Sequence, residues 1–213
     1  QSFNLINSLS SLDILPDSTI FTWDLPISSP ENAVSGGFQG SDSNIIQTLT
    51  NNTTSPATLS YVVSSSTIQG CNDNNFSLNV IVNPTAQVDQ PLDQVICNGD
   101  TTSIVEFATE NTGGTTTYAW TNNTPSIGLS GSGSGDILAF TATNITTEPI
   151  VATITVTPSF ENGGVICYGE DKTFTITVNP TAQVDDITDQ VICHLDEVSV
   201  LFSTQNTSGT SSY

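Results

Sequence analysis

The chain has 213 residues, of which 21 are acidic and only one is Lys or Arg, so its formal net charge is −20. Such a chain repels phosphate backbones and anionic lipid headgroups, which argues against nucleic acid and membrane surfaces as partners. No apolar run approaches the roughly 20 residues of a membrane-spanning helix. Abundant Thr, Ser, Asn and Gly favour strands and turns over helices, which indicates an all-β fold.

The octapeptide Val-Asn-Pro-Thr-Ala-Gln-Val-Asp occurs at 82–89 and again at 178–185, an offset of 96 residues. An offset of that size is one whole domain. It predicts a repeat over 1–83 that lacks its first strand and first cysteine, a complete repeat over 84–179, and the start of a third over 180–213. Because each junction holds a Pro and no Gly/Ser linker, we expect an elongated, semi-rigid array.

Period-two alternation of apolar and polar residues predicts about seven strands in each repeat. In the first repeat, the inward row of the last strand is Phe76, Leu78, Val80 and Val82. In the complete repeat, a first strand covers 88–96, and the later inward rows are Val105 and Phe107; Tyr118 and Trp120; a short strand near 127–129; Leu138, Phe140 and Ala142; Ala152, Ile154 and Val156; and Phe174, Ile176 and Val178. Gly131–Gly135 is expected to be a flexible hairpin tip. This spacing around one central, core-filling Trp predicts tandem immunoglobulin-like β-sandwich domains.

The four cysteines are Cys71, Cys97, Cys167 and Cys193. Only Cys97 and Cys167 share the complete repeat, so we predict a disulfide between them, and partners outside 1–213 for Cys71 and Cys193. The alternative is a bond across a junction, from Cys71 to Cys97 or from Cys167 to Cys193. A zinc site is disfavoured because there is no Cys-x-x-Cys and a single His. Disulfides indicate an oxidising compartment and therefore secretion.

Residues for catalysis are scarce. The only His, His194, is expected in a solvated turn, and the only Lys, Lys172, follows Glu170 and Asp171. The glycine-rich stretch 131–135 has no Lys and no following helix, so it is not a phosphate loop. We therefore predict that the chain is not an enzyme and has no catalytic residues, metal site or cofactor.

Calcium at the junctions is a minority hypothesis. Aspartates gather near the start of the second and third repeats, and hard carboxylate oxygens are ligands that Ca²⁺ prefers. They are Asp89, Asp93 and Asp100, then Asp185, Asp186, Asp189 and Asp196. Their spacing matches no EF-hand, and solvated strand ends are the alternative interpretation.

The junction Val-Asn-Pro-Thr-Ala, together with Gln-Val-Ile-Cys, Thr-Tyr-Ala-Trp and Thr-Phe-Thr-Ile-Thr-Val-Asn-Pro, resembles the PKD-like repeats of giant cell-surface adhesins in gliding Bacteroidota. PKD domains proper carry Trp-Asp-Phe-Gly-Asp-Gly. Trp23-Asp24 keeps only its beginning and Trp120-Thr121 not even that, which favours the PKD-like branch.

The resemblance implies an adhesin filament on the cell surface, attached to the outer membrane and exported by type 9 secretion for gliding motility. The implied partners are neighbouring repeats, the motility and secretion machinery, and surface polysaccharide or another substratum, with no membrane insertion. It also implies O-glycosylation after Asp, for which Ser18 and Thr101 are the candidates. Asn52 and Asn144 fit the eukaryotic N-glycosylation pattern.

The predicted function is thus a structural and adhesive stalk repeat. The alternative is a carbohydrate-binding or spacer module of a secreted multidomain enzyme. A carbohydrate-binding module would require exposed aromatic residues lined up on one face, and the sequence shows no such row. A secreted hydrolase, the third hypothesis, would require a cleft with convergent carboxylates.

Overall fold

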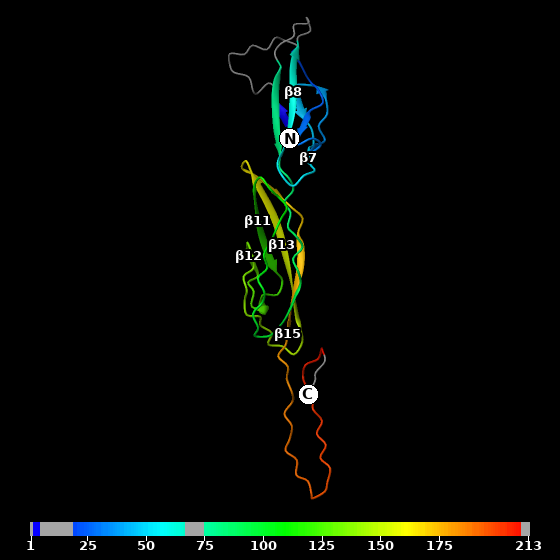
Figure 1. Ribbon diagram of the computed structural model, residues 1–213, viewed down its shortest axis with the longest axis vertical. Helices are drawn as coiled ribbons and strands as arrows, with labels where there is room; N and C mark the ends of the chain where they lie inside the picture. Colours follow the sequence, from blue (N-terminus) through cyan, green and yellow to red (C-terminus); the bar gives the residue numbers. More distant parts are fainter. Residues whose placement is uncertain (1, 5–18, 67–74, 210–213) are drawn as a thin grey trace. The chain divides into compact units, whose positions relative to one another are not determined.

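The computed structural model describes residues 2–4, 19–66 and 75–209 (Figure 1). The chain divides into two compact units. The first comprises Gln1–Gln87, Thr109–Thr116 and Ser159–Gly169, and the second comprises Val88–Ala108, Thr117–Pro158 and Glu170–Tyr213. Within the described residues every regular element is a strand except one 3-10 turn, η1 (Pro125–Ile127). The prediction of all-β, immunoglobulin-like sandwich repeats is confirmed.

The first core is built on a five-stranded antiparallel sheet. Its long central strand β8 pairs with β9 along one edge and with β2 and β3 along the other, and β5 extends β2. The sheet strands are β2 (Ile20–Trp23), β3 (Ile27–Ser29), β5 (Gly40–Ser41), β8 (Ala57–Ser66) and β9 (Phe76–Val82). Two short pairs accompany the sheet: β1 (Ser2–Asn4) with β6 (Asn44–Ile46), and β4 (Val34–Ser35) with β7 (Thr50–Asn51).

Strand β8 carries the largest fully buried side chain of this core, Tyr61, because alternate residues of the strand face inward. The Tyr61 hydroxyl donates a hydrogen bond to Gln47 Oε1 at 2.7 Å, and burial raises the pKa of the phenol above its ordinary value. The predicted inward row of β9 holds for Val80, which is buried, and for Leu78 and Val82, which pack against the core. Phe76 lies exposed at the start of the strand.

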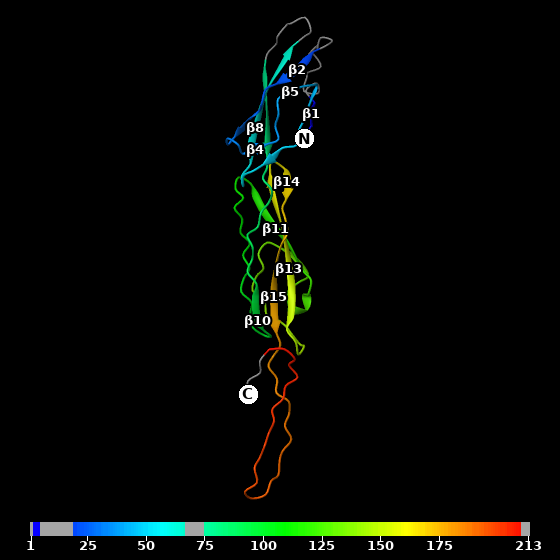
Figure 2. The ribbon, with the colours of Figure 1, turned by 90° about the vertical axis from the view of Figure 1, so that its right-hand side faces the viewer.

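The second core is built on a six-stranded sheet in the order β10-β15-β13-β11-β12, with β14 pairing the far end of β13 (Figure 2). The strands are β10 (Gln94–Cys97), β11 (Thr115–Asn122), β12 (Ser132–Ser134), β13 (Ile150–Asn162), β14 (Val165–Tyr168) and β15 (Lys172–Asn179). β10 runs parallel to β15, whereas β13 runs antiparallel to it. The facing layer is made of extended segments joined by the isolated bridges Thr101–Thr141 and Val105–Ile137.

The predicted alternation of β13 and β15 is confirmed, because the apolar residues of both strands are buried between rows of Thr. Trp120 and Trp23 also lie in the cores, as expected. Trp120 Nε1 donates to the Gly135 carbonyl at 3.1 Å, and Trp23 Nε1 donates to that of Phe38 at 2.9 Å. Each Trp is therefore held in place by the hydrogen bond of its indole N–H as well as by burial of its ring.

Gly131–Gly135 is not the flexible tip that the sequence suggested. Its centre forms strand β12, in which Gly133 pairs with Trp120. A side chain at Gly133 would overlap the indole ring of Trp120, and a Cβ at Gly40 would lie only 2.6 Å from Trp23 Cζ2. Glycine is needed at both positions because the ring of the paired Trp covers the strand.

Three further expectations need correction. The first strand is short, Gln94–Cys97 rather than 88–96, and the strand expected near 127–129 is replaced by η1, although Ile127 and Leu129 are both buried. Leu138 is 71% exposed, whereas its neighbour Ile137 is 2% exposed. The segment 137–142 is irregular, so Ile137 and Ala142 both reach the core, which strict alternation would forbid.

Candidate functional site: the repeat junction

The first junction is organised by one side chain, Asn111. Asn111 Oδ1 accepts a hydrogen bond from the Gln87 backbone at 2.7 Å, and Nδ2 donates to the carbonyls of Thr54 and Thr85, both at 3.2 Å. The backbone of Thr112 also donates to the Thr54 carbonyl at 3.0 Å. One amide side chain thus links the octapeptide, a loop of the preceding repeat and the Asn-Thr-Gly segment of the following repeat.

The loop that presents Thr54 is held by a second asparagine, Asn51. Its Nδ2 donates to the carbonyls of Ser55 and Val82 at 2.8 and 2.7 Å, and its Oδ1 accepts from the backbone and hydroxyl of Thr53, both at 2.8 Å. Because Asn favours such side-chain-to-backbone turns, the loop closes on itself and leaves the Thr54 carbonyl facing the next repeat.

The second junction repeats this arrangement with equivalent residues. Asn206 Oδ1 accepts from the Gln183 backbone at 2.9 Å, and Asn206 Nδ2 donates to the carbonyls of Thr147 and Thr181 at 3.5 and 3.2 Å. Asn144 is the equivalent of Asn51. Its Nδ2 donates to the carbonyls of Glu148 and Val178 at 2.8 and 2.7 Å. We call this hydrogen-bonded set around Asn111 or Asn206 the junction clasp.

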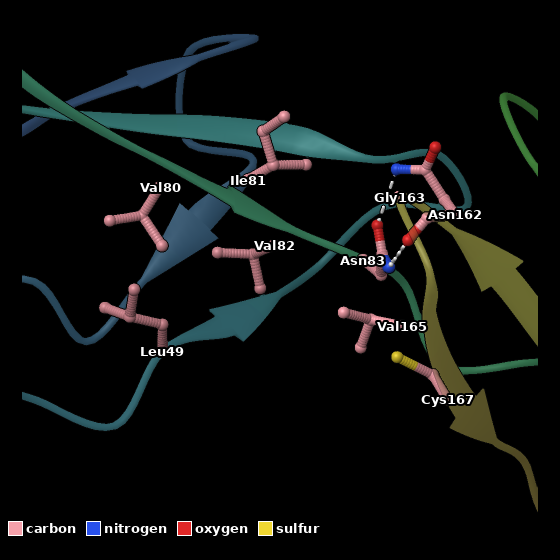
Figure 3. Close-up of a pocket in the computed structure, with 9 residues that line it drawn as sticks. All are labelled: Leu49, Val80, Ile81, Val82, Asn83, Asn162, Gly163, Val165 and Cys167. Carbon is pink, nitrogen blue, oxygen red and sulfur yellow. Dashed lines mark hydrogen bonds between the residues drawn. The ribbon is translucent and has the colours of Figure 1, made fainter. Parts of the chain in front are cut away.

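The hairpin formed by β13 and β14 of the complete repeat is also hydrogen-bonded to the first junction. Asn162 Nδ2 donates to Asn83 Oδ1 at 2.9 Å, and Asn83 Nδ2 donates to the Asn162 carbonyl at 3.0 Å. Beside this pair lies a mostly apolar cavity of about 320 Å³ (Figure 3). Its lining includes Val82, Val165 and Cys167. Such a surface suits packing between segments of the chain, and it offers no acid–base pair for catalysis.

The structure does not join Cys97 to Cys167, because both thiols are free. Cys97 lies beside Asn179 in β15, whereas Cys167 lies opposite Phe160 in β13. The neighbouring residue Val178 pairs with Ile150, ten positions before Phe160 on β13. Ten positions along β13 therefore separate the strand neighbours of the two cysteines.

The alternative pairings across a junction are not formed either. Cys193 is free and exposed, so Cys167 is not bonded to it, and Cys97 is free as well. Cys71 lies outside the described residues. The pairing of Cys71 and Cys193 with cysteines beyond 1–213 stays a prediction.

The aspartates near the junctions do not converge. Asp93 Oδ1 accepts from the Thr175 backbone at 2.6 Å, and Asp185 Oδ2 accepts from the Ser203 hydroxyl at 2.6 Å. Among residues 19–66 and 75–209, the structure brings together no set of three or more His, Cys, Asp or Glu side chains that could hold a metal. The calcium hypothesis therefore finds no site in this part of the chain.

Three other residues singled out from the sequence lie within the described part of the chain, and one lies outside it. His194 lies exposed in a turn after Cys193, as predicted. Thr101 is exposed and forms an isolated bridge with Thr141, while Ser18 lies outside the described residues. Asn144, which fits the N-glycosylation pattern, is instead buried in the second junction loop.

The sequence patterns did not point to the clasp residues Asn51, Asn111, Asn144 and Asn206. A signal for the loop was present: Asn-x-Thr-Thr-x-Pro occurs at 51–56 and again at 144–149. It was hidden because the two copies are 93 residues apart rather than 96, so a single offset does not align them.

Fold and junction together define a tandem β-sandwich repeat protein. The family profile described as a PKD-like domain matches residues 7–86, and no curated protein matches the chain. The crystal structure of human mucin-like protocadherin EC1-2 is similar over 79% of this chain and 87% of its own, at 12% identity and a TM-score of 0.27. No helix in the described part of the chain is long and apolar enough to cross a membrane.

Proposed function

We propose that this chain is a non-catalytic structural segment of an extracellular adhesive stalk. The observation that carries the proposal is the junction clasp, which occurs at both junctions with equivalent residues. A flexible linker would need no such hydrogen bonds, since a chain with free joints gains nothing from ordering them. A repeated clasp is useful where the orientation of each domain relative to the next must be fixed, as in a stalk.

The net charge of −20 supports the same function. Like charges on successive repeats oppose the folding back of one repeat onto another, and they keep a long polymer soluble. Under this proposal the repeat boundaries are 83/84 and 179/180, and the partners of each repeat are its neighbours in the chain.

The finer proposal is the stalk of a surface adhesin in a gliding bacterium, carried on the outer membrane and exported by type 9 secretion. Its support is the set of sequence motifs at the junction, at Cys97, at Trp120 and in β15, together with the PKD-like profile over 7–86. Surface polysaccharide and the motility machinery are the partners that this proposal implies.

Small-angle X-ray scattering of the whole chain tests the stalk. A compact globule of this length would have a radius of gyration of about 17 Å, and we expect a clearly larger value. Asn111→Ala should broaden the distribution of interatomic distances, because it removes the clasp. Asn52→Ala is the control, since Asn52 lies in the same loop and, among the described residues, its side chain bonds only to Ser35. A radius near 17 Å for the unaltered chain would refute the stalk.

A further inference from the structure

The complete repeat places one cysteine at each of its two junctions. Cys97, the last residue of β10, pairs in parallel register with Asn179, the junction asparagine that follows Val178. The next residue, Asn98, donates its backbone N–H to the Asn179 carbonyl at 2.9 Å, and its side chain donates to Thr181 Oγ1 at 2.9 Å. Cys97 is exposed, so its sulfur is accessible at the point where the third repeat begins.

Cys167 lies at the other junction, on the hairpin that grips Asn83. It lines the same cavity as Val82 and Asn83, and its sulfur points into that cavity (Figure 3). The hairpin is fixed there by the two hydrogen bonds between Asn83 and Asn162. Cys167 is therefore held next to the last residues of the preceding repeat rather than next to Cys97.

Asn83 and Asn179 occupy the same position in the two copies of the octapeptide, and the same clasp surrounds both copies. The position of Cys97 beside Asn179 and the position of Cys167 beside Asn83 can therefore be combined in a single junction. The preceding repeat brings a cysteine equivalent to Cys97 to the junction asparagine, and the following repeat brings a cysteine equivalent to Cys167 to the same asparagine.

We propose that these two cysteines form a disulfide that links consecutive repeats across their junction. Each repeat would then carry two such bonds, through Cys97 to the repeat after it and through Cys167 to the repeat before it. Within residues 1–213 neither junction contains both members of the pair, because the sequence has no cysteine before Cys71 and none after Cys193. The pairing thus accounts for the free thiols of Cys97, Cys167 and Cys193.

Bond formation requires a disulfide oxidant, such as glutathione disulfide or an oxidised thiol–disulfide oxidoreductase. One cysteine thiolate attacks the oxidant and releases one thiol, and the second cysteine thiolate then displaces the remaining half. Two thiols of the stalk are oxidised, one disulfide of the oxidant is reduced to two thiols, and the two protons go to the leaving thiolates. The linkage deepens the proposed stalk, on which it rests, because it would keep a junction closed after its hydrogen bonds break.

The test uses the full chain with a second copy of residues 84–179 inserted directly after Asn179. Because the octapeptide is identical at both junctions, the insertion creates native junctions and brings a second Cys167 to the Asn179 that adjoins the first Cys97. The unaltered chain and the enlarged chain are folded with glutathione disulfide, and free thiols are alkylated. Disulfide-linked peptides are then mapped by mass spectrometry without reduction.

We expect one bond in the enlarged chain, between Cys97 of the first copy and Cys167 of the second, and none in the unaltered chain. Cys97→Ala in the first copy should abolish that bond, whereas Cys97→Ala in the second copy should leave it intact. A bond between Cys97 and Cys167 of one copy, or thiols that all stay free, would overturn the proposal. Either result would leave the scattering of the chain unchanged, so the stalk and the linkage can fail separately.

Discussion

Residues 84–116 and 180–209 carry the same motifs in the same order, yet their apolar side chains lie in different surroundings. Val88 is 5% exposed and Phe107 is 9% exposed, whereas the equivalent Val184 and Phe202 are 55% and 49% exposed. Val88 and Phe107 pack into the core that includes Trp120. Burial of the opening segment therefore depends on strands that come from much later in the repeat.

The hydrogen bonds of the junction clasp, in contrast, are equivalent in the two segments. Asn111 and Asn206 make equivalent hydrogen bonds, although one belongs to a closed sandwich and the other to a segment with exposed apolar residues. The clasp needs only the octapeptide, the Asn-x-Thr-Thr-x-Pro loop and the Asn-Thr segment. The joint between repeats is therefore specified by three short segments, whereas the core of each repeat is specified over its full length.

The comparison is tested most strongly by truncating the two phenylalanines. Phe107→Ala should lower the free energy of unfolding of the complete repeat by about 3–5 kcal/mol, because it removes a large buried ring and leaves a cavity. Phe202→Ala should change it by less than about 0.5 kcal/mol, since half of that side chain is already in water. Urea unfolding followed by the fluorescence of Trp120 measures both. Equal losses would show that 180–209 is as well packed as 84–116.

A second substitution tests the packing of Trp120 against the late strand β12. Gly133→Ala should cost about 1–3 kcal/mol, because the new methyl group must displace the indole ring that covers β12. Gly131→Ala is the matched control, since its Cβ would meet only Pro125 Cγ at 3.4 Å. The same urea titration compares the two. If Gly131→Ala were the more harmful change, the tight contact of Trp120 with β12 would not be what holds the ring.

Period-two patterns predicted the regular parts of the fold well. Phe174, Ile176 and Val178 alternate with Thr and are buried as expected, because β15 is a regular strand flanked by two others. The pattern failed at Leu138, where the chain forms only isolated bridges and strict alternation does not apply. Local pattern is thus informative only where a continuous ladder of hydrogen bonds enforces it.

The site was harder to predict than the core. The octapeptide drew attention to the segment that holds Thr85 and Gln87, but Asn111 acts through Thr54, more than fifty positions away, and nothing local to either residue indicates that contact. The predicted Cys97–Cys167 bond is not formed in the structure. Membership of one repeat does not place these two cysteines side by side, because Cys97 lies on β10 beside the end of β15 and Cys167 lies on β14 beside the far end of β13.

Hydrogen exchange at the two clasps can show whether they form independently of each other. Asn111→Ala should speed the hydrogen exchange of the Gln87 amide and cost about 1–2 kcal/mol, because the change leaves hydrogen-bonding groups at the junction unpaired. Asn206→Ala should affect the Gln183 amide in the same way, with a smaller cost because its hydrogen bonds are longer. Exchange monitored by NMR resolves both amides. A response of the Gln183 amide to Asn111→Ala would mean that the two clasps are coupled.

Burial of a side chain by late strands can also be tested in the first repeat, by titrating the phenol of Tyr61. Tyr61 on β8 is buried against the sheet, and burial raises the pKa of its phenol above that of the unfolded chain. The folded state therefore binds the phenol proton more tightly than the unfolded state does. The contribution of Tyr61 is fully present below the unfolded pKa of about 10, and it is lost as the pH rises through the folded value.

Unfolding of the first repeat in urea between pH 8 and pH 11 should thus show falling stability above about pH 10. Tyr61→Phe should flatten that fall, because it removes the titrating group while keeping the ring in the core. The hydrogen bond to Gln47 is lost as well, so the variant should start about 1 kcal/mol lower at pH 8. An equally steep fall in the variant would assign the alkaline loss to other groups, and the strands of the first repeat would then not protect Tyr61 as its burial implies.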